Sequence, residues 1–434
     1  MSIVFSSLNH AQRVPLAAEI HSRPPLNIDA PALLTHFAIV GEAGQHALLA
    51  ELCAHFGVAA PAAGGKYFSH DFGRFRLKWE LHTEFATYTF AEAVAHMPLP
   101  EEAFASMPAR HLPEQWLLRL QGRVMVAAHV MLARPGAAPQ AFAASLQRLF
   151  QGAPLAGSQV MQGGELWTDF AIHADGFSRF VICDAGMHRQ QSGRLVQRVL
   201  EIETYRMMAL MGLPYAQTAT PELNAVEAEL ATLAASLVEA DGHYDDASIE
   251  QALLHRISHL AARIEKLSLE NSYRFAASKA YFGLVNARIE ELRELRIEGA
   301  PTVEEFMDRR LAPALKTCEA VAARQEALAR RIANSNDLLR TRVGIVQEAQ
   351  NRQILESLNK RALQQLRLQQ AVEGLSVAAI SYYVVGLIGY SAKGAKSLGW
   401  VGNPELLIGV LVPVVAAGVW LSLRSMHKRL QGHK

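Results

Sequence analysis

Two long apolar runs near the C-terminus dominate the pattern of hydrophobic and polar positions in this chain. They cover Gly374–Ala392 and Leu406–Leu423 and contain no charged residue. The hydrocarbon core of a bilayer is about 30 Å thick and a helix rises about 1.5 Å per residue, so each run is near the length needed to cross it. A soluble helix is rarely apolar on all sides, and Pro413 is better tolerated in a membrane helix. The pattern predicts a transmembrane hairpin over residues 374–423.

Basic residues flank the predicted hairpin on both outer sides. Residues 316–370 hold ten Lys or Arg against five Asp or Glu, and the tail 424–434 is basic without an acid. The loop between the runs has two Lys and one Glu. Because Lys and Arg are enriched in cytoplasmic flanks, we expect both termini in the cytoplasm, the loop outside and the lipid bilayer as a partner.

The N-terminal part, residues 1–185, has the short alternating segments of a sheet with helices packed against it. A short helix is predicted at Gln45–Phe56, and turns are predicted at Gly163-Gly164 and Asp175-Gly176. The expected strands are Leu33–Val40, a pair within Arg74–Phe90, one within Trp116–Leu132 and others within Gln159–Cys183.

After these strands the chain reads as helical. Leu195–Met211 is predicted as a helix that ends at Gly212-Leu213-Pro214. Pro221–Glu239 and Ala247–Gly299 are predicted as an antiparallel pair that turns at residues 240–246.

A third helical stretch leads into the first apolar run. Thr302 and Glu305 have the spacing of a capping box, which predicts a helix start. Apolar residues then recur at spacings of three to four and seven, as in a coiled-coil seam, although Gln325 and Ser335 are weak seam residues. The seam residues are Val321, Leu328, Ile332, Leu339 and Val346.

The predicted fold class is an α+β cytoplasmic domain followed by a long helical stalk and a C-terminal two-helix transmembrane hairpin. Its parts are a mixed α/β domain (1–185), a helical region with an acidic helix pair (186–300), a stalk helix (301–373), the hairpin (374–423) and a basic cytoplasmic tail (424–434).

Five long stretches of the chain carry a family resemblance. Together they resemble a proteobacterial family described only as predicted membrane-anchored proteins of unknown function. The resemblance implies a bacterial inner-membrane location and supplies no activity. The stretches are EIHSRPP (19–25), KWELHTEFATYTF (78–90), GRLVQRVLEIETYRMMALMGLP (193–214), NSYRFAASKAY (271–281) and LRLQQAVEGLSVAAISYYVVGLIGYSAKG (366–394).

A second likeness is architectural. A cytoplasmic α/β domain, an acidic helix pair, a stalk helix, two spans and a basic tail resemble the two-span CorA-type divalent-metal channels. That family has Gly-Met-Asn at the outer end of its first span, where this chain has Gly389-Tyr390-Ser391. The departure puts any cation selectivity in doubt.

The first apolar run has a polar face. Ser376, Tyr383 and Tyr390 recur every seven residues and so share one side of a helix, with Gly386 and Gly389 near it. Polar groups in a bilayer are costly unless satisfied, so this face is expected to line an oligomer interface or a pore; a lipid-facing stripe is the third alternative.

The acidic helix pair is a candidate cation site. Residues 221–250 carry eight Asp or Glu and no Lys or Arg, and such oxygens bind hydrated divalent cations. The turn lacks the calcium pattern D-x-[DN]-x-[DN]-G, and acids before Ala247 also favour a helix N-terminus electrostatically. His255 and His259 lie one turn apart and lack a nearby third ligand. The candidate cation ligands are Glu239, Asp241, Asp245 and Asp246.

A polar cluster is predicted in the sheet domain. Glu80, His82 and Glu84 alternate along an expected strand, so they are expected on one face, which also holds Arg76 and Lys78 and is expected to be wet. Arg23 or His21 from the EIHSRPP stretch is expected to reach the same place. The cluster fits metal binding or catalysis, and a salt-bridged structural cluster explains it equally simply.

Composition and motifs narrow the function further. The net charge is +1 and no basic track with interleaved aromatics occurs, which argues against nucleic-acid binding. The three cysteines are far apart, as expected for a reducing compartment and not for a zinc ribbon. Common nucleotide-binding, serine-hydrolase and metalloprotease motifs are absent, so no catalytic residue is assigned.

Three functions remain. The first is a membrane-anchored homo-oligomeric scaffold or sensor with a cytoplasmic binding domain. The second is a CorA-like cation channel or transporter, with a divalent cation as its ligand. The third is a membrane-tethered enzyme whose site includes Glu80, His82 and Glu84.

Overall fold

The computed structural model divides the chain into two compact units. The first covers residues 1–236 and 256–335, and the second covers residues 237–255 and 336–434. The residues described are 8–14, 16–17, 24, 26–41, 43–62, 64–134, 139–151, 155–187, 189–239, 247–397 and 403–431.

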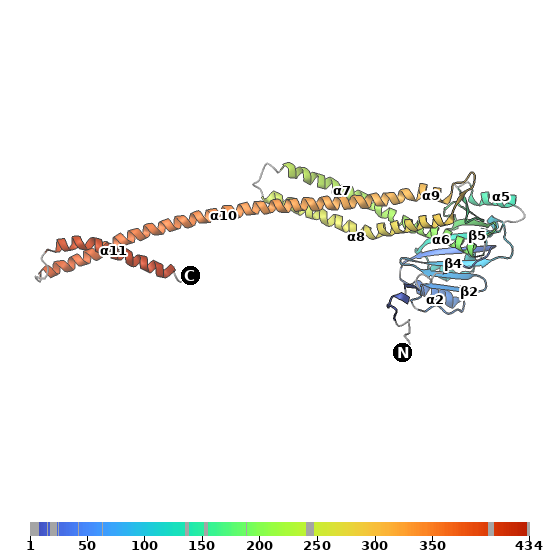
Figure 1. Ribbon diagram of the computed structural model, residues 1–434, viewed down its shortest axis with the longest axis horizontal. Coiled ribbons are helices and arrows are strands. Elements are labelled where there is room, and N and C mark those ends of the chain that lie inside the picture. The colour runs from blue at the N-terminus through green and yellow to red at the C-terminus, as the bar shows by residue number, and fades with distance from the viewer. Residues whose placement is uncertain are drawn as a thin grey trace. The chain divides into compact units, whose positions relative to one another are not determined.

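A mixed sheet forms the base of the first unit (Figure 1). Its nine described strands lie in the order β2-β3-β4-β1-β5-β8-β7-β6-β9. The pairings are antiparallel except for β5 with β8, which is parallel. The strands are β1 (Ala32–Val40), β2 (Tyr67–Asp71), β3 (Arg76–Leu81), β4 (Phe85–Ala93), β5 (Val124–Ala133), β6 (Ala156–Val160), β7 (Gly164–Thr168), β8 (Ser178–Asp184) and β9 (Leu295–Arg296).

The predicted α+β domain is confirmed, and most of its strands lie where alternation indicated. One prediction was wrong at its N-terminal end: Trp116 belongs to a helix, α4 (Glu114–Leu118), and β5 begins only at Val124. The indole of Trp116 donates to the Leu48 carbonyl oxygen at 2.9 Å, which anchors α4 on helix α2 (Gln45–His55). Tertiary packing thus decided the structure of an apolar segment whose pattern fits either element.

Both faces of the sheet are covered, so the strands have side chains buried on two sides. Helices α2 and α4 pack on one face with Phe37, Ile39 and Trp79. Two further helices, α3 (Pro100–Phe104) and α5 (Pro139–Phe150), cover the β5 and β8 part of that face. The 3-10 helix η2 (Pro108–His111) lies between α3 and α4 in sequence.

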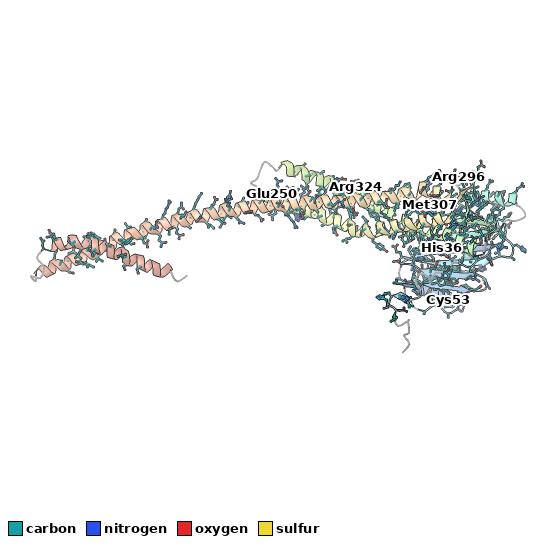
Figure 2. All side chains as sticks on the ribbon, viewed as in Figure 1. His36, Cys53, Glu250, Arg296, Met307 and Arg324 are labelled. Carbon is teal, nitrogen blue, oxygen red and sulfur yellow. The ribbon has the colours of Figure 1, made fainter. Side chains whose placement is uncertain are left out.

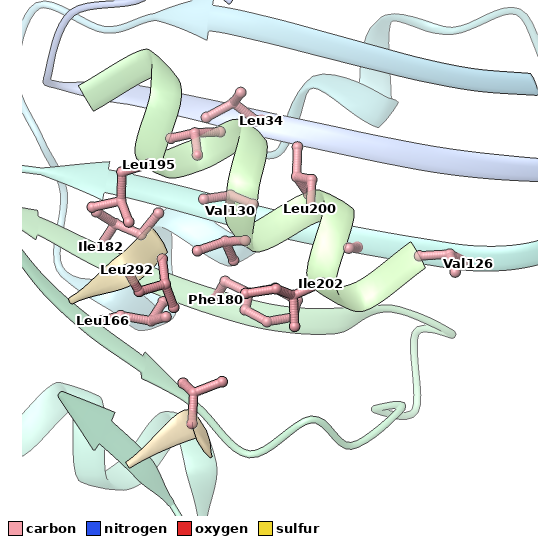
Figure 3. Packing of buried hydrophobic residues seen from close by; sticks show 14 of the residues in the cluster. Leu34, Val126, Val130, Leu166, Phe180, Ile182, Leu195, Leu200, Ile202 and Leu292 are labelled. Carbon is pink, nitrogen blue, oxygen red and sulfur yellow. The ribbon is translucent and has the colours of Figure 1, made fainter. Parts of the chain in front are cut away.

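The opposite face is covered by helix α6 (Arg189–Leu210). Figure 3 shows Leu195, Leu200 and Ile202 of α6 packed over apolar residues of β5 and β8, including Val130 and Phe180. The prediction that this face of β3 is wet was therefore wrong. Lys78 is only 4% exposed, because α6 lies over it.

The close approach of α6 to the preceding chain depends on Gly193. A Cβ atom at Gly193 would lie 1.8 Å from the Leu26 carbonyl oxygen, which is a backbone atom and cannot rotate away. We expect Gly193→Ala to lower the free energy of unfolding by about 1–3 kcal/mol, as overpacking does. The measurement is urea unfolding followed by tryptophan fluorescence. Gly283→Ala, in a helix with open space around it, is the control and should be neutral or stabilising.

Helices α7 (Gly212–Glu239), α8 (Ala247–Leu292) and α10 (Ala312–Ser397) contribute to a bundle in the first unit. Each presents a buried stripe at three-to-four-residue spacing, which is why they pack side by side. On α7 the stripe is Ala216, Ala219, Leu223, Val226 and Leu230.

The structure confirms one helix end and corrects two other bounds. Helix α6 ends at Leu210, as the Gly212-Leu213-Pro214 stop predicted. Helix α7 begins at Gly212 and not at Pro221, because proline is tolerated in a first helical turn, and α8 ends at Leu292 and not at Gly299, because the chain then enters β9. Cβ on Gly212 would lie 2.5 Å from Ser278 Oγ, so glycine allows α7 and α8 to approach closely. The capping box of Thr302 and Glu305 is confirmed at the start of α9 (Val303–Arg310).

Part of the predicted stalk seam packs against other helices of the same chain. Val321, Leu328 and Ile332 of α10 are buried in the first unit, where Lys279 of α8 lies 3.6 Å from Glu319. Gln325 is buried at the same seam. From Gln347 to Val372 the residues of α10 are exposed, and the helix continues through Gly344 and Gly374 without a break (Figure 2).

In the second unit, the end of α10 packs against α11 (Pro404–Gln431). A Cβ atom on Gly389 would lie 3.2 Å from Ile408 Cδ1, so the two helices touch there. Among the described residues, one helical stretch ending at Gly394 is long and apolar enough to cross a membrane, and a shorter apolar helix spans Ile408–Ser422.

Candidate functional site

A cavity of about 220 Å³ lies between the sheet and helix α6 in the first unit. Strands β1, β3 and β4 form its floor, α6 forms one wall, and Arg288 of α8 lies at its edge. We call this cavity the α6 pocket. Its lining combines apolar residues, such as Leu26, Phe85 and Leu200, with an unusual number of charged and hydroxyl groups.

Strand register places the polar groups of the pocket floor in rows. Thr89 of β4 pairs with His36 on one side and with Lys78 on the other, so these three side chains form a row across three strands. Thr87 and Glu80 form the next row. Residues two apart on a strand point to the same face, which is why Lys78 and Glu80 meet α6 together.

Helix α6 adds a polar stripe above that floor. Gln197, Glu201 and Thr204 are spaced four and three residues apart, so they share one side of the helix. Lys78 Nζ donates to Gln197 Oε1 at 3.2 Å and lies 3.1 Å from Glu80 Oε2. Gln197 Nε2 in turn donates to Glu201 Oε1 at 2.8 Å.

The hydrogen-bonded chain continues to α8. Arg288 Nε donates to Glu201 Oε2, and Arg288 also pairs with Glu291 at 2.9 Å. The pocket thus holds two acid–base pairs, Lys78 with Glu80 and Arg288 with Glu201, joined through Gln197. The ionised Lys, Arg and Glu side chains that line the pocket balance at two positive and two negative charges.

His36 lies on the floor of the α6 pocket and is held neutral there. Its Nδ1 lies 2.8 Å from Thr89 Oγ1 and its Nε2 lies 3.2 Å from Thr204 Oγ1, so both ring nitrogens are hydrogen-bonded. Burial, with smaller contributions from the nearby Lys78 and His82, lowers the pKa of His36 from 6.5 to about 3. A neutral ring donates to one threonine and accepts from the other, which fixes α6 to the sheet.

Two members of the predicted polar cluster, Glu80 and His82, line this pocket. His82 stacks on Phe85 with ring centroids 4.4 Å apart. Glu84 does not join them, because β3 ends at Leu81 and Glu84 lies in the turn before β4. Arg23 and His21 lie outside the described residues.

Glu84 makes a separate contact that ties the β3–β4 turn to α8. Arg274 donates to its two carboxylate oxygens at 2.8 and 3.1 Å, and both side chains are largely buried. Burial raises the pKa of Glu84, but hydrogen bonds from Arg274 and Tyr281 outweigh it, so the pKa lies below its usual value. Glu84 is therefore an ionised partner of a buried arginine.

The residues missed by sequence reasoning are those that only the fold brings together. Glu201 accepts a hydrogen bond from Gln197 in its own helix, yet its charged partner Arg288 lies 87 positions away. Within α6, Glu203 pairs with Arg206 at 2.7 Å. The available signal was that Gln197, Glu201 and Thr204 share one side of the helix.

The acids of α7 have ordinary structural partners in the described part of the bundle. Glu222 and Glu229 pair with Arg263 of α8 at 3.2 and 3.1 Å, and Glu227 pairs with Arg324 of α10. Of the predicted cation ligands, Asp241, Asp245 and Asp246 lie outside the described residues, and Glu239 is the last residue of α7.

The described residues contain no group of three or more His, Cys, Asp or Glu arranged to hold a metal ion. His255 and His259 are both exposed on α8. The sulfhydryl groups show no reactive character: Cys53 and Cys318 are buried, and burial raises the pKa of Cys183 to about 12.

The residues predicted to form one polar face on the first apolar run lie on two different sides of the helix. Tyr383 and Tyr390 are exposed at 71% and 78%, and Ser376 is half-buried. Gly389 is buried and belongs to the side that faces α11, whereas Gly386 is exposed. The tyrosine side and the α11 side of this helix are therefore different surfaces.

The fold and pocket define a class of protein: an α+β domain with a buried polar cavity, joined to a long helix that contains an apolar segment of membrane-spanning length. The chain belongs to the family described as protein of unknown function (DUF3422), whose model matches residues 8–430. No curated protein matches the chain.

Proposed function

We propose that this protein is a membrane-anchored, homo-oligomeric sensor that binds a small polar molecule in the α6 pocket. The observation that carries the proposal is the chain of part-buried polar contacts from Lys78 to Arg288 around a cavity of about 220 Å³. Removing charged groups from water costs free energy, and ion pairing repays this cost only in part. Ligand sites typically combine apolar walls with a few convergent polar groups, as this cavity does.

The proposed anchor is a two-span hairpin formed by the end of α10 and by α11. The first apolar segment passes the length and composition requirement for a span, and large apolar side chains such as Leu375 and Leu387 are exposed on it. Water would penalise such exposure, whereas lipid would not. Both termini are proposed to lie in the cytoplasm of a bacterial inner membrane, following the Lys and Arg excess of the flanks.

We propose that ligand and anchor are coupled through the packing of α8 on α10 and through the continuity of α10. Arg288 lies on α8, and α8 packs beside α10, the helix that continues into the first apolar segment. Ligand binding that rearranges the Glu201–Arg288 pair would change how α8 lies on α6. We propose this rearrangement as the sensing step.

Topology tests the anchored part of the proposal. A cysteine introduced at Ser397, in a variant without native cysteines, should react with a membrane-impermeant maleimide in intact cells, because the loop is proposed to face outward. Cysteines placed at residues 10 and 430 are the matched controls and should react only after cells are opened. Labelling of the terminal positions but not of position 397 in intact cells would reverse the orientation.

A CorA-like cation channel is the alternative that the exposed side of the first apolar segment favours. If that side lines a pore, Tyr383→Ala should change cation flux into liposomes, while Val384→Ala, which is about 100° further around the helix and only partly exposed, should not. If the wild type gives no more flux than empty liposomes, the channel function is excluded and the sensor function remains. A membrane-tethered enzyme has less support, because Glu80, His82 and Glu84 do not form one cluster.

A further inference from the structure

We infer that the α6 pocket takes a small zwitterion of the amino-acid type, with one carboxylate and one ammonium group. This inference rests on the proposed ligand-binding function and names its ligand class. It follows from how the charges in the pocket are arranged, which restricts what can enter without leaving a buried charge unpaired.

The first step is the charge balance. Lys78 is 4% exposed, and the Glu80 side chain paired with it is 13% exposed. Arg288 and Glu201 form the second pair, at 27% and 21% exposure. An entering anion or cation would add an uncompensated charge to this balanced site, which is strongly unfavourable away from water. A ligand of zero net charge avoids that penalty.

The second step is the kind of neutral ligand. The two acid–base pairs lie at the two ends of a hydrogen-bonded chain through Gln197. A ligand carboxylate can bind Lys78 or Arg288 while the ligand ammonium binds the acid released from that cation. Each buried charge then keeps an opposite partner, and the ligand gains charge-assisted hydrogen bonds. An uncharged sugar makes only the weaker neutral hydrogen bonds.

The third step is size and apolar contact. A cavity of about 220 Å³ is smaller than typical drug-binding pockets, so the ligand is a small metabolite. Leu26, Phe85 and Leu200 provide an apolar wall beside the charged chain. This wall suits an amino acid with an uncharged, partly apolar side chain.

The experiment uses the full-length protein in detergent and measures its melting temperature by tryptophan fluorescence. The probes are the standard amino acids one at a time, with glucose, inorganic phosphate and putrescine as neutral, anionic and cationic comparisons. At about 100 times its Kd, a binding amino acid should raise the melting temperature by about 5 °C. Its amide, which lacks the carboxylate, and its N-acetyl form, which lacks the ammonium, should bind about tenfold or more weakly.

Two arginine variants make the test specific to the pocket. Arg288→Gln should weaken binding by about tenfold or more, because it removes one pocket cation. Arg198→Gln is the matched control: Arg198 pairs with the same Glu291, is 21% exposed and does not line the pocket. It should bind like the wild type.

Several results would overturn the inference. They are no response to any amino acid, a response only to glucose, phosphate or putrescine, equal binding of the amide and N-acetyl forms, and equal effects of the two arginine variants. The cysteine-labelling measurement of topology does not depend on the ligand. A wrong ligand class would therefore appear only in the melting-temperature assay, and a wrong anchor only in the labelling.

Discussion

Acidification from pH 6.5 to pH 4 is expected to lower the free energy of unfolding of the first unit by about 3 kcal/mol through His36 alone. In the folded chain the pKa of His36 is about 3, against 6.5 for an ordinary histidine, so below pH 6.5 the unfolded chain binds a proton that the folded chain does not. The contribution of His36 to stability is therefore fully present above pH 6.5 and is lost as the pH falls from 6.5 toward 3. The measurement is urea unfolding at several pH values, followed by tryptophan fluorescence.

His129 adds to the same loss and supplies an internal comparison. Burial lowers the pKa of His129 to about 4, and its ring stacks on Phe177 at 3.8 Å on the other face of the sheet. His36→Gln should remove roughly half of the pH dependence, and His36→Gln with His129→Gln should remove most of it. His55→Gln, at an exposed position on the last turn of α2, is the control for the loss of a histidine as such. An equal slope in the wild type and the double variant would contradict the assignment.

Removal of the Glu84 carboxylate is expected to lower the free energy of unfolding by about 3 kcal/mol. Glu84→Ala leaves Arg274, whose side chain is 7% exposed, without its bidentate partner in a largely buried site. A buried charge that loses its partner typically costs 3–5 kcal/mol, roughly, and the residual exposure of this pair places it at the lower end. The measurement is the same urea titration at pH 7.

Two further variants separate this effect from general damage. Glu51→Ala removes the partner of Arg119 in an exposed pair, at 57% and 43% exposure, and should cost less than about 1 kcal/mol. Glu84→Gln combined with Arg274→Met should recover much of the loss, because neither buried charge then remains. A small effect of Glu84→Ala, equal to that of Glu51→Ala, would show that the pair is hydrated.

The positions of the buried, apolar strands were predicted well from the sequence. Leu33–Val40 is almost continuously apolar and became β1, a central strand covered on both faces. The turns at Gly163-Gly164 and Asp175-Gly176 separate β6, β7 and β8 as expected. The helix start at Thr302 was predicted equally well, because Thr302 and Glu305 bond each other's backbone N–H groups and lie only three positions apart.

The pocket shows why sites are harder to derive from sequence than elements. Its members come from β1, β3, β4, α6 and α8, and the pairs that matter join residues 119 and 87 positions apart, Lys78 with Gln197 and Arg288 with Glu201. Charged residues that alternate along a strand indicate a wet face unless a later helix covers them. The local pattern holds no information about which helix does so.

The sequence by itself determined the class of each segment: the α+β character of the first part, the helical character of the rest, the helix start at Thr302 and the apolar segments near the C-terminus. These follow from interactions between residues a few positions apart, which periodicity and capping record. Only the tertiary structure decided that α6 buries Lys78 and His36, that Glu84 turns away to Arg274, and that Val321, Leu328 and Ile332 pack within their own chain. The physical reason is that burial and charge pairing depend on which distant surfaces meet, and a linear pattern does not specify that choice.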